Sequence, residues 1–269
     1  MDKRPVVFFD SGLGCLPYGH FFHSRNRGER LVCVADRQNF PYGEKSADAL
    51  VEILDTLIQK IISRINPKIV ALVCNTASVT ALDFLREKYP SLPIVGTVPA
   101  VKPAVMFSKT RRVGVIGSVR TIKDPYIAEL AAQYGPDCEI FKEAAPELID
   151  FAQYRFWAAS PAERLEAVSP YIEKFRALGI DSIVLACTHF LLLQDDFCLA
   201  AGKDIALFDS MEGVSRRVEA ILDDEGKKPR SGLTPCGAVP ALVLTGQAEQ
   251  EVYWQELCRR FGFVLEGNL

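Results

Sequence analysis

The chain has 269 residues, of which 49% are hydrophobic and 24% charged. This composition is typical of a folded globular protein and excludes disorder over most of the length. The net charge of −3 gives no electrostatic reason to expect nucleic acid as a partner. No apolar run approaches the ~20 residues that span a bilayer, and no signal-peptide core follows Met1, so we expect a cytoplasmic protein without membrane contact.

Short apolar runs alternate with longer amphipathic stretches along the chain. In the first half, strands are expected at 6–9, 31–35, 69–73 and 93–95, and helices after the first loop, at 46–65 and at 78–88. In the second half, strands are expected at 113–116, 183–186 and 205–208, and helices at 123–134, from Ser160 to Gly179 and at 211–222. A surface loop at 227–237 and a β/α tail at 242–261 complete the pattern.

The apolar strands lack polar alternation and are separated by amphipathic helices, which indicates parallel sheets covered on both faces. Residues 6–11 match 113–118 in pattern, and 69–76 match 183–188. We therefore predict an α/β fold of two similar parallel-sheet domains related by pseudo-twofold symmetry, with a site in the cleft between them. The expected domains are 1–97 plus 210–269, and 98–209.

Several familiar cofactor and catalytic motifs are missing. Gly12 and Gly14 follow the first strand, but Pro17 stands where a dinucleotide fingerprint needs its third glycine. There is no Walker lysine loop, no His-Glu-x-x-His pair and no Gly-x-Ser-x-Gly elbow. Cys15, His20 and His23 could be imagined as metal ligands, but their spacing fits no standard site. We expect neither a metal nor a cofactor.

Two cysteines among the eight stand out. Cys74-Asn75-Thr76 and Cys187-Thr188-His189 each follow a buried strand and precede an expected helix N-terminus. One such cysteine would most simply be a packed core thiol, since free cysteine is often buried. Two cysteines in equivalent places of a duplicated fold indicate a catalytic role for both. The positive end of a helix favours the thiolate form that such a role needs. A pair of opposed acid/base groups is what inversion at a carbon requires, with Asp10 and His189 as candidate proton partners.

At these residues the sequence resembles the glutamate racemases, within the cofactor-independent aspartate/glutamate racemase superfamily. The motifs that carry the resemblance are 9–14 (FDSGLG), 41–43 (PYG), 74–77 (CNTA), 114–118 (GVIGS) with Thr121, and 186–189 (ACTH). The resemblance implies interconversion of L- and D-glutamate without a cofactor, supplying D-glutamate for peptidoglycan. It also implies a C-terminal segment that returns to the first domain, and a possible homodimer.

The resemblance further implies roles for individual residues. Cys74 would act on the D-isomer and Cys187 on the L-isomer, with Asp10 and His189 supporting these thiols. Asp10 and His189 would also contact the substrate. The other substrate-binding residues implied are Ser11, Pro41, Tyr42, Gly43, Asn75, Thr76, Ser118, Thr121 and Thr188.

The chain also departs from the family pattern. A glutamate usual in the family near the second-domain histidine aligns with Gln153, and a neutral amide stabilises an imidazolium less well than a carboxylate does. Cys15 adds a third thiol close to the first motif. Two alternatives therefore stay open beside glutamate racemisation. One is a related racemase or epimerase acting on aspartate or another amino acid; the other is a weakly active relative that binds an amino acid or a protein partner.

Overall fold

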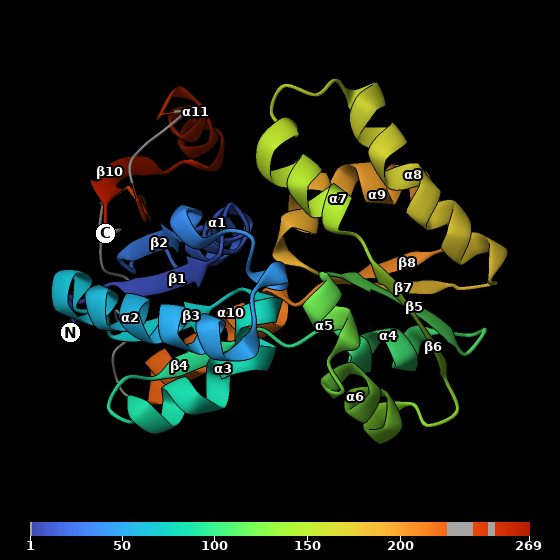
Figure 1. Cartoon of the computed structure of the whole chain (residues 1–269), viewed down its shortest axis with the longest axis horizontal. Coiled ribbons are helices and arrows are strands. Elements are labelled where there is room, and N and C mark those ends of the chain that lie inside the picture. Colours follow the sequence, from blue (N-terminus) through green and yellow to red (C-terminus); the bar gives the residue numbers. More distant parts are fainter. Residues whose placement is uncertain (1, 225–238, 247–250) are drawn as a thin grey trace. The chain divides into compact units, whose positions relative to one another are not determined.

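The computed structural model describes residues 2–224, 239–246 and 251–269 (Figure 1). The chain forms two compact units, one made of Met1–Thr97 with Met211–Leu269 and the other of Val98–Ser210. The surface loop expected at 227–237 lies outside the described residues. Among the helices described, none combines the length and apolar character that crossing a bilayer requires.

A six-stranded parallel sheet forms the centre of the first unit, in the order β10-β9-β2-β1-β3-β4. Its strands are β1 (Val6–Asp10), β2 (Leu31–Ala35), β3 (Ile69–Leu72), β4 (Ile94–Gly96), β9 (Ala241–Leu244) and β10 (Val264–Asn268). Its helices are α1 (Cys15–Arg25), α2 (Ala47–Ile65), α3 (Asn75–Lys88), α10 (Met211–Asp224) and α11 (Glu251–Phe261), with 3₁₀ turns at Arg37–Asn39 and Tyr42–Glu44. Because the strands are parallel, the carboxyl ends of β2, β1 and β3 lie side by side.

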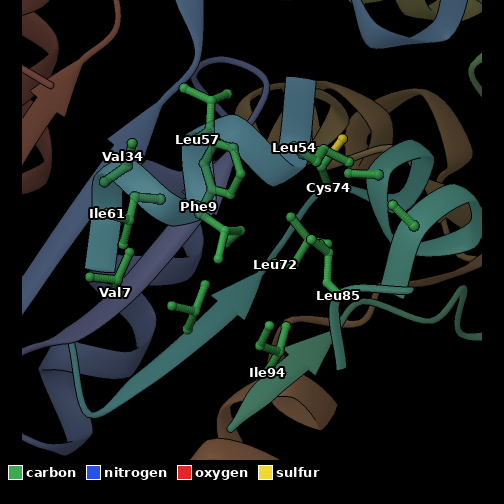
Figure 2. Packing of buried hydrophobic residues seen from close by; sticks show 14 of the residues in the cluster. Val7, Phe9, Val34, Leu54, Leu57, Ile61, Leu72, Cys74, Leu85 and Ile94 are labelled. Atoms are coloured by element: carbon green, nitrogen blue, oxygen red, sulfur yellow. The ribbon is translucent and has the colours of Figure 1, made fainter. Parts of the chain in front are cut away.

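Helices cover both faces of this sheet. On one face, Phe9 of β1 belongs to a buried cluster with Leu54 and Leu57 of α2 (Figure 2). On the other face, the ring of Phe8 lies 5.2 Å from the ring of Phe22 in α1. Successive residues of β1 therefore point to opposite helix layers, which explains why its sequence is apolar without alternation.

The second unit is built on a four-stranded parallel sheet in the order β6-β5-β7-β8. Its strands are β5 (Arg112–Gly117), β6 (Glu139–Ala144), β7 (Ser182–Ala186) and β8 (Ala206–Phe208). Its helices are α4 (Val101–Phe107), α5 (Val119–Lys123), α6 (Tyr126–Tyr134), α7 (Pro146–Asp150), α8 (Pro161–Ala177) and α9 (Gln194–Ala201), with a π-helix at Phe151–Arg155 and a 3₁₀ helix at Thr188–Leu193. Val105 of α4 and Ile127 of α6 are buried against Val113 and Val115 of β5.

The order β2-β1-β3-β4 of the first sheet is repeated as β6-β5-β7-β8 in the second. The predicted pair of similar parallel-sheet α/β domains is thus confirmed. The helix start predicted at Ser160 is also confirmed, since Ser160 and Glu163 form a reciprocal capping box.

One predicted helix, at 123–134, is wrong in its extent. The segment forms two helices, α5 and α6, and Asp124 between them is extended with ψ of 137°. Pro125 explains the interruption, because proline disfavours the helical conformation at the residue before it.

Candidate active site

The backbone of Cys74 is fixed at the junction of β3 and α3. Cys74 is the N-cap of α3, and its carbonyl accepts a hydrogen bond of 2.9 Å from the Ser78 N–H. The hydroxyls of Ser78 and Thr97 both donate to the carbonyl of Leu72, at 3.0 and 3.1 Å. The helix begins three residues earlier than the sequence predicts, so Cys74 lies directly at its N-terminus.

The first unit gathers polar groups around the Cys74 thiol. Its Sγ donates to Ser11 Oγ over 3.7 Å, and only 5% of the residue is exposed. Tyr42 is buried in the same cluster as Cys74. Burial raises the pKa of Tyr42 well above its usual value, and the charges of Asp36, Cys74 and Asp10 raise it further. Asp10, Ser11, Tyr42 and Cys74 therefore form one buried group at the carboxyl ends of β1 and β3.

The first residues of α3 belong to the same region. Asn75 and Thr76 are buried beside Cys74, and within the described chain Asn75 Oδ1 has no hydrogen-bond partner. A buried acceptor without a donor is unusual in a folded protein. Pro41 and Gly43 flank Tyr42 at the start of the second 3₁₀ turn.

Cys187 holds the matching place in the second unit, directly after β7. The α-helix start expected after it is wrong: Thr188 begins a 3₁₀ helix, and α9 follows only from Gln194. Such tight turns are common at the beginning of an α-helix. Thr188 and His189 are both buried in this 3₁₀ segment.

His189 lies between Cys187 and Gln153. Its Nδ1 is 3.9 Å from Cys187 Sγ, and its Nε2 is 2.8 Å from Gln153 Oε1. An amide oxygen can only accept, so Nε2 carries the hydrogen and Nδ1 presents its lone pair to the thiol. Burial lowers the pKa of His189 to about 3, so the ring is neutral near neutral pH. The lone pair of Nδ1 therefore faces the Cys187 thiol, but the lowered pKa makes the imidazole a weak base toward it.

Ser118 is the N-cap of α5, the helix that follows β5, and Thr121 lies in the first turn of this helix. The Ser118 hydroxyl accepts from the Thr121 N–H at 3.2 Å and donates to Thr121 Oγ1 at 3.0 Å. Gly117 of β5 and Ala186 of β7 are partners in the sheet. Ser118 and Cys187 therefore follow neighbouring strands at adjacent positions of the same sheet end.

Two residues of these regions escaped the list of expected site residues. Gln153 is buried on the π-helix; the sequence marks it only as a departure from the family pattern. Asp36 is fully buried at the end of β2 and accepts hydrogen bonds from Tyr42, Asn39 and Thr245. A signal for Asp36 exists, because it follows an apolar strand just as Asp10 ends β1.

Two of the three side chains considered as metal ligands, His20 and Cys15, make hydrogen bonds to backbone carbonyls. His20 Nδ1 lies 2.9 Å from the carbonyl of Phe261, and Cys15 donates to the carbonyl of Gly12 at 3.5 Å. Burial raises the pKa of Cys15 well above its usual value, with the neighbouring Cys33 adding to the shift. In the described part of the chain, no three His, Cys, Asp or Glu side chains are grouped to hold a metal ion.

Comparison with known proteins places these features in a family. The model of the Asp/Glu/Hydantoin racemase family matches residues 27–214, which is more than two thirds of the chain. Glutamate racemase of Treponema pallidum (strain Nichols) is 40% identical over 216 residues, covering 80% of each chain. Glutamate racemase of Sphingopyxis alaskensis is 34% identical over 248 residues, covering 91% of this chain and 90% of the relative.

A solved structure agrees with the sequence matches. Escherichia coli glutamate racemase in complex with L-glutamate and the activator UDP-MurNAc-ala is similar with a TM-score of 0.83 and 28% identity. The similarity covers 99% of this chain and 98% of the other. With two sheets of repeated strand order, a cysteine just beyond the corresponding strand of each, and relatives of this identity and coverage, the chain belongs to the Asp/Glu/hydantoin racemase family.

Proposed function

We propose that this protein is a glutamate racemase, an isomerase that interconverts L- and D-glutamate. The observation that carries the proposal is the placement of Cys74 and Cys187 just beyond β3 and β7, which are corresponding strands of two sheets with the same order. Each thiol has a neighbouring polar side chain suited to proton transfer: Ser11 lies beside Cys74, and His189 lies beside Cys187. The named relatives support glutamate as the substrate.

In the proposed mechanism the two thiols act on opposite faces of the substrate's α-carbon. For L-glutamate, the Cys187 thiolate takes the α-proton, and the electron pair of the C–H bond passes into the α-carboxylate. The Cys74 thiol then donates a proton to the other face, which yields D-glutamate and leaves Cys74 as the thiolate. The reverse reaction exchanges the two roles. Each direction forms and breaks one C–H and one S–H bond, so no redox partner is needed.

The remaining site residues are assigned to substrate binding. Asp10 and His189 assist the thiols, and the buried Asn75 Oδ1 is suited to accept a hydrogen bond from the substrate's ammonium group. The N-terminus of α3 supplies partial positive charge for a carboxylate. We assign the other contacts to Ser11, Pro41, Tyr42, Gly43, Thr76, Ser118, Thr121 and Thr188.

Proton NMR in heavy water tests the function directly. Purified protein is given L-glutamate, D-glutamate, L-aspartate or D-aspartate separately, without added cofactor or metal. We expect the α-proton signal to vanish from both glutamate enantiomers, with the opposite isomer appearing, and to persist in aspartate. Exchange confined to aspartate would contradict the substrate assignment. Folded protein that exchanges no α-proton would contradict racemase activity and favour an amino-acid-binding relative.

Gln153→Glu is expected to raise the pKa of His189 by about one to three units, because a carboxylate beside Nε2 stabilises the imidazolium. The thiolate–imidazolium form of Cys187 and His189 then becomes more populated, so kcat/KM for L-glutamate should rise near neutral pH. With only three histidines in the chain, NMR can follow the His189 ring signal through a titration. Gln153→Met is the uncharged control and should not raise the pKa. If the pKa of His189 rises in Gln153→Glu and the pH–rate profile stays unchanged, His189 takes no part in the proton transfer.

The same histidine affects stability in acid. Its folded pKa of about 3 lies below the ordinary 6.5, so between these values the unfolded chain binds a proton that the folded chain does not. The free energy of unfolding therefore falls as pH drops through this window. Gln153→Glu should narrow the window, which urea unfolding at several pH values measures.

We also propose that the enzyme works in the cytoplasm, where it supplies D-glutamate for peptidoglycan, and forms a homodimer. The mechanism needs both cysteines as thiols, and the cytosol keeps thiols reduced. The seven cysteines in the described part of the chain are all free thiols. Sedimentation equilibrium would measure the assembly directly.

A further inference from the structure

A buried carboxylate organises the segment that carries Tyr42. Asp36 stands directly after β2, is fully buried, and accepts a 2.6 Å hydrogen bond from the Tyr42 hydroxyl. The side-chain amide of Asn39 donates to both Asp36 oxygens, at 3.1 and 2.9 Å. Three hydroxyl or amide groups thus converge on one carboxylate, with Thr245 completing the set. Charge-assisted bonds of this kind are stronger than neutral ones, and stronger still away from water.

Thr245 comes from the far end of the chain. The Thr245 hydroxyl donates to Asp36 Oδ1 at 2.5 Å, and Thr245 Oγ1 accepts from the Gln38 N–H at 3.1 Å. Its own N–H donates to the carbonyl of Ala35 at 3.1 Å. Pairing of β9 with β2 brings Thr245 to this place. The returning C-terminal segment therefore contacts the segment before Tyr42 through both its backbone and its side chain.

The hydroxyl of Tyr42 has one hydrogen, and that hydrogen is committed to Asp36. Burial and the nearby negative charges keep the phenol protonated, since they raise its pKa well above the usual value. The ring itself is 2% exposed and packs in the cluster that contains Cys74 and Leu50. Tyr42 is therefore held from both ends, by Asp36 at the hydroxyl and by apolar neighbours at the ring.

We propose that Asp36, clamped by Thr245, is a positioning residue that holds Tyr42 and its neighbours Pro41 and Gly43 in place beside Cys74. The proposal rests on the proposed function, because it assigns to Asp36 the arrangement of a substrate-binding segment. Asp36 touches no reacting atom in this scheme. Its contribution is to fix the segment before substrate arrives, which removes an ordering cost from binding.

The kinetics of Thr245 variants test the proposal at a residue to which no substrate contact is assigned. Thr245→Val keeps the side-chain shape but removes the donor to Asp36 and the acceptor for Gln38. We expect KM for glutamate to rise about tenfold with a smaller change in kcat, because binding in ground and transition states weakens alike. Thr245→Ser retains the hydroxyl and should recover most of the loss. Asp36→Asn removes the charge and should raise KM further than Thr245→Val does.

Two controls keep the outcome sharp. All assays run well below the unfolding temperature of each variant. If Asp36 and Thr245 only stabilised the fold, the substitutions would lower the unfolding temperature and leave KM unchanged. Wild-type KM in folded Thr245→Val and Asp36→Asn would overturn the proposal, and so would a loss that Thr245→Ser fails to recover.

A second readout does not depend on activity. NMR of ¹³Cζ-labelled tyrosine, assigned with Tyr42→Phe, should show that Asp36→Asn lowers the pKa of Tyr42 relative to the wild type. An unchanged pKa of Tyr42 in Asp36→Asn would contradict the proposed interaction between Asp36 and Tyr42, and this holds even if the protein has no racemase activity. An inactive wild type with the titration shift present would instead count against the proposed function alone.

Discussion

Serine in place of either Cys74 or Cys187 will reduce glutamate racemisation by about 1,000-fold or more, because a hydroxyl is far less acidic than a thiol and is a poor acid/base group near neutral pH. The two enantiomers have equal free energy in water, so kcat/KM must be the same in both directions for every variant. Each substitution therefore lowers both directions together. Circular dichroism of glutamate solutions over time measures the loss.

The two variants will differ in hydrogen exchange. In Cys74→Ser, the remaining Cys187 still removes the α-proton of L-glutamate and can return a deuteron from heavy water to the same face. L-glutamate then exchanges without forming its D-isomer, and Cys187→Ser shows the opposite preference. Cys198→Ser is the matched control, since Cys198 is exposed on α9 and is assigned no role. Full turnover in either site variant would refute the two-thiol mechanism.

Lys68→Met will lower the free energy of unfolding by about 3–5 kcal/mol, because it strands a buried carboxylate. Lys68 Nζ lies 2.5 Å from Glu29 Oε2, and both side chains are only 2% exposed. The ammonium also donates to the carbonyl of Asp2 at 3.1 Å. The substitution removes the Lys68 ammonium from Glu29 Oε2, while the methylene stem is replaced by a side chain of similar size. Urea unfolding measures the change.

The double variant Glu29→Gln with Lys68→Met separates pairing from packing. It removes both charges, so most of the stability lost in Lys68→Met should return. Lys88→Met is the surface control, since the Lys88 side chain is 43% exposed and the expected change is about 0–1 kcal/mol. A Lys68→Met variant as stable as the control would show that Glu29 finds other compensation.

The strands that the sequence predicts correctly are those whose residues are buried on both faces, such as β1 and β7. The strand β6 was not predicted, because it lies at the edge of its sheet and mixes charged and apolar residues with partial exposure. The short helices α4 and α7 were missed as well, since two turns or fewer give little periodicity. A strand that is buried on both faces has a clear apolar sequence pattern, whereas an edge strand does not.

Some features of the candidate site can likewise be predicted from the sequence, and others cannot. Cys74 and Cys187 are visible in the sequence because each follows a buried strand within a repeated pattern. The contact of Asp36 with Thr245 is not visible, since 209 positions separate them and only the pairing of β2 with β9 brings them together. The 3₁₀ start after Cys187 is equally hidden, because the run from Phe190 to Leu193 is apolar throughout and carries no helical period.

The discontinuity of the first unit has a consequence for synthesis on the ribosome. Residues up to Thr97 emerge first, but β2 has an unpaired edge until β9 follows some 140 residues later. Such an edge is a template for mispairing. The second unit is continuous and emerges whole before that partner does. Completion of the first sheet thus waits for the end of translation, and a chain truncated before Ala241 would carry both candidate thiols yet present an open strand to other nascent chains.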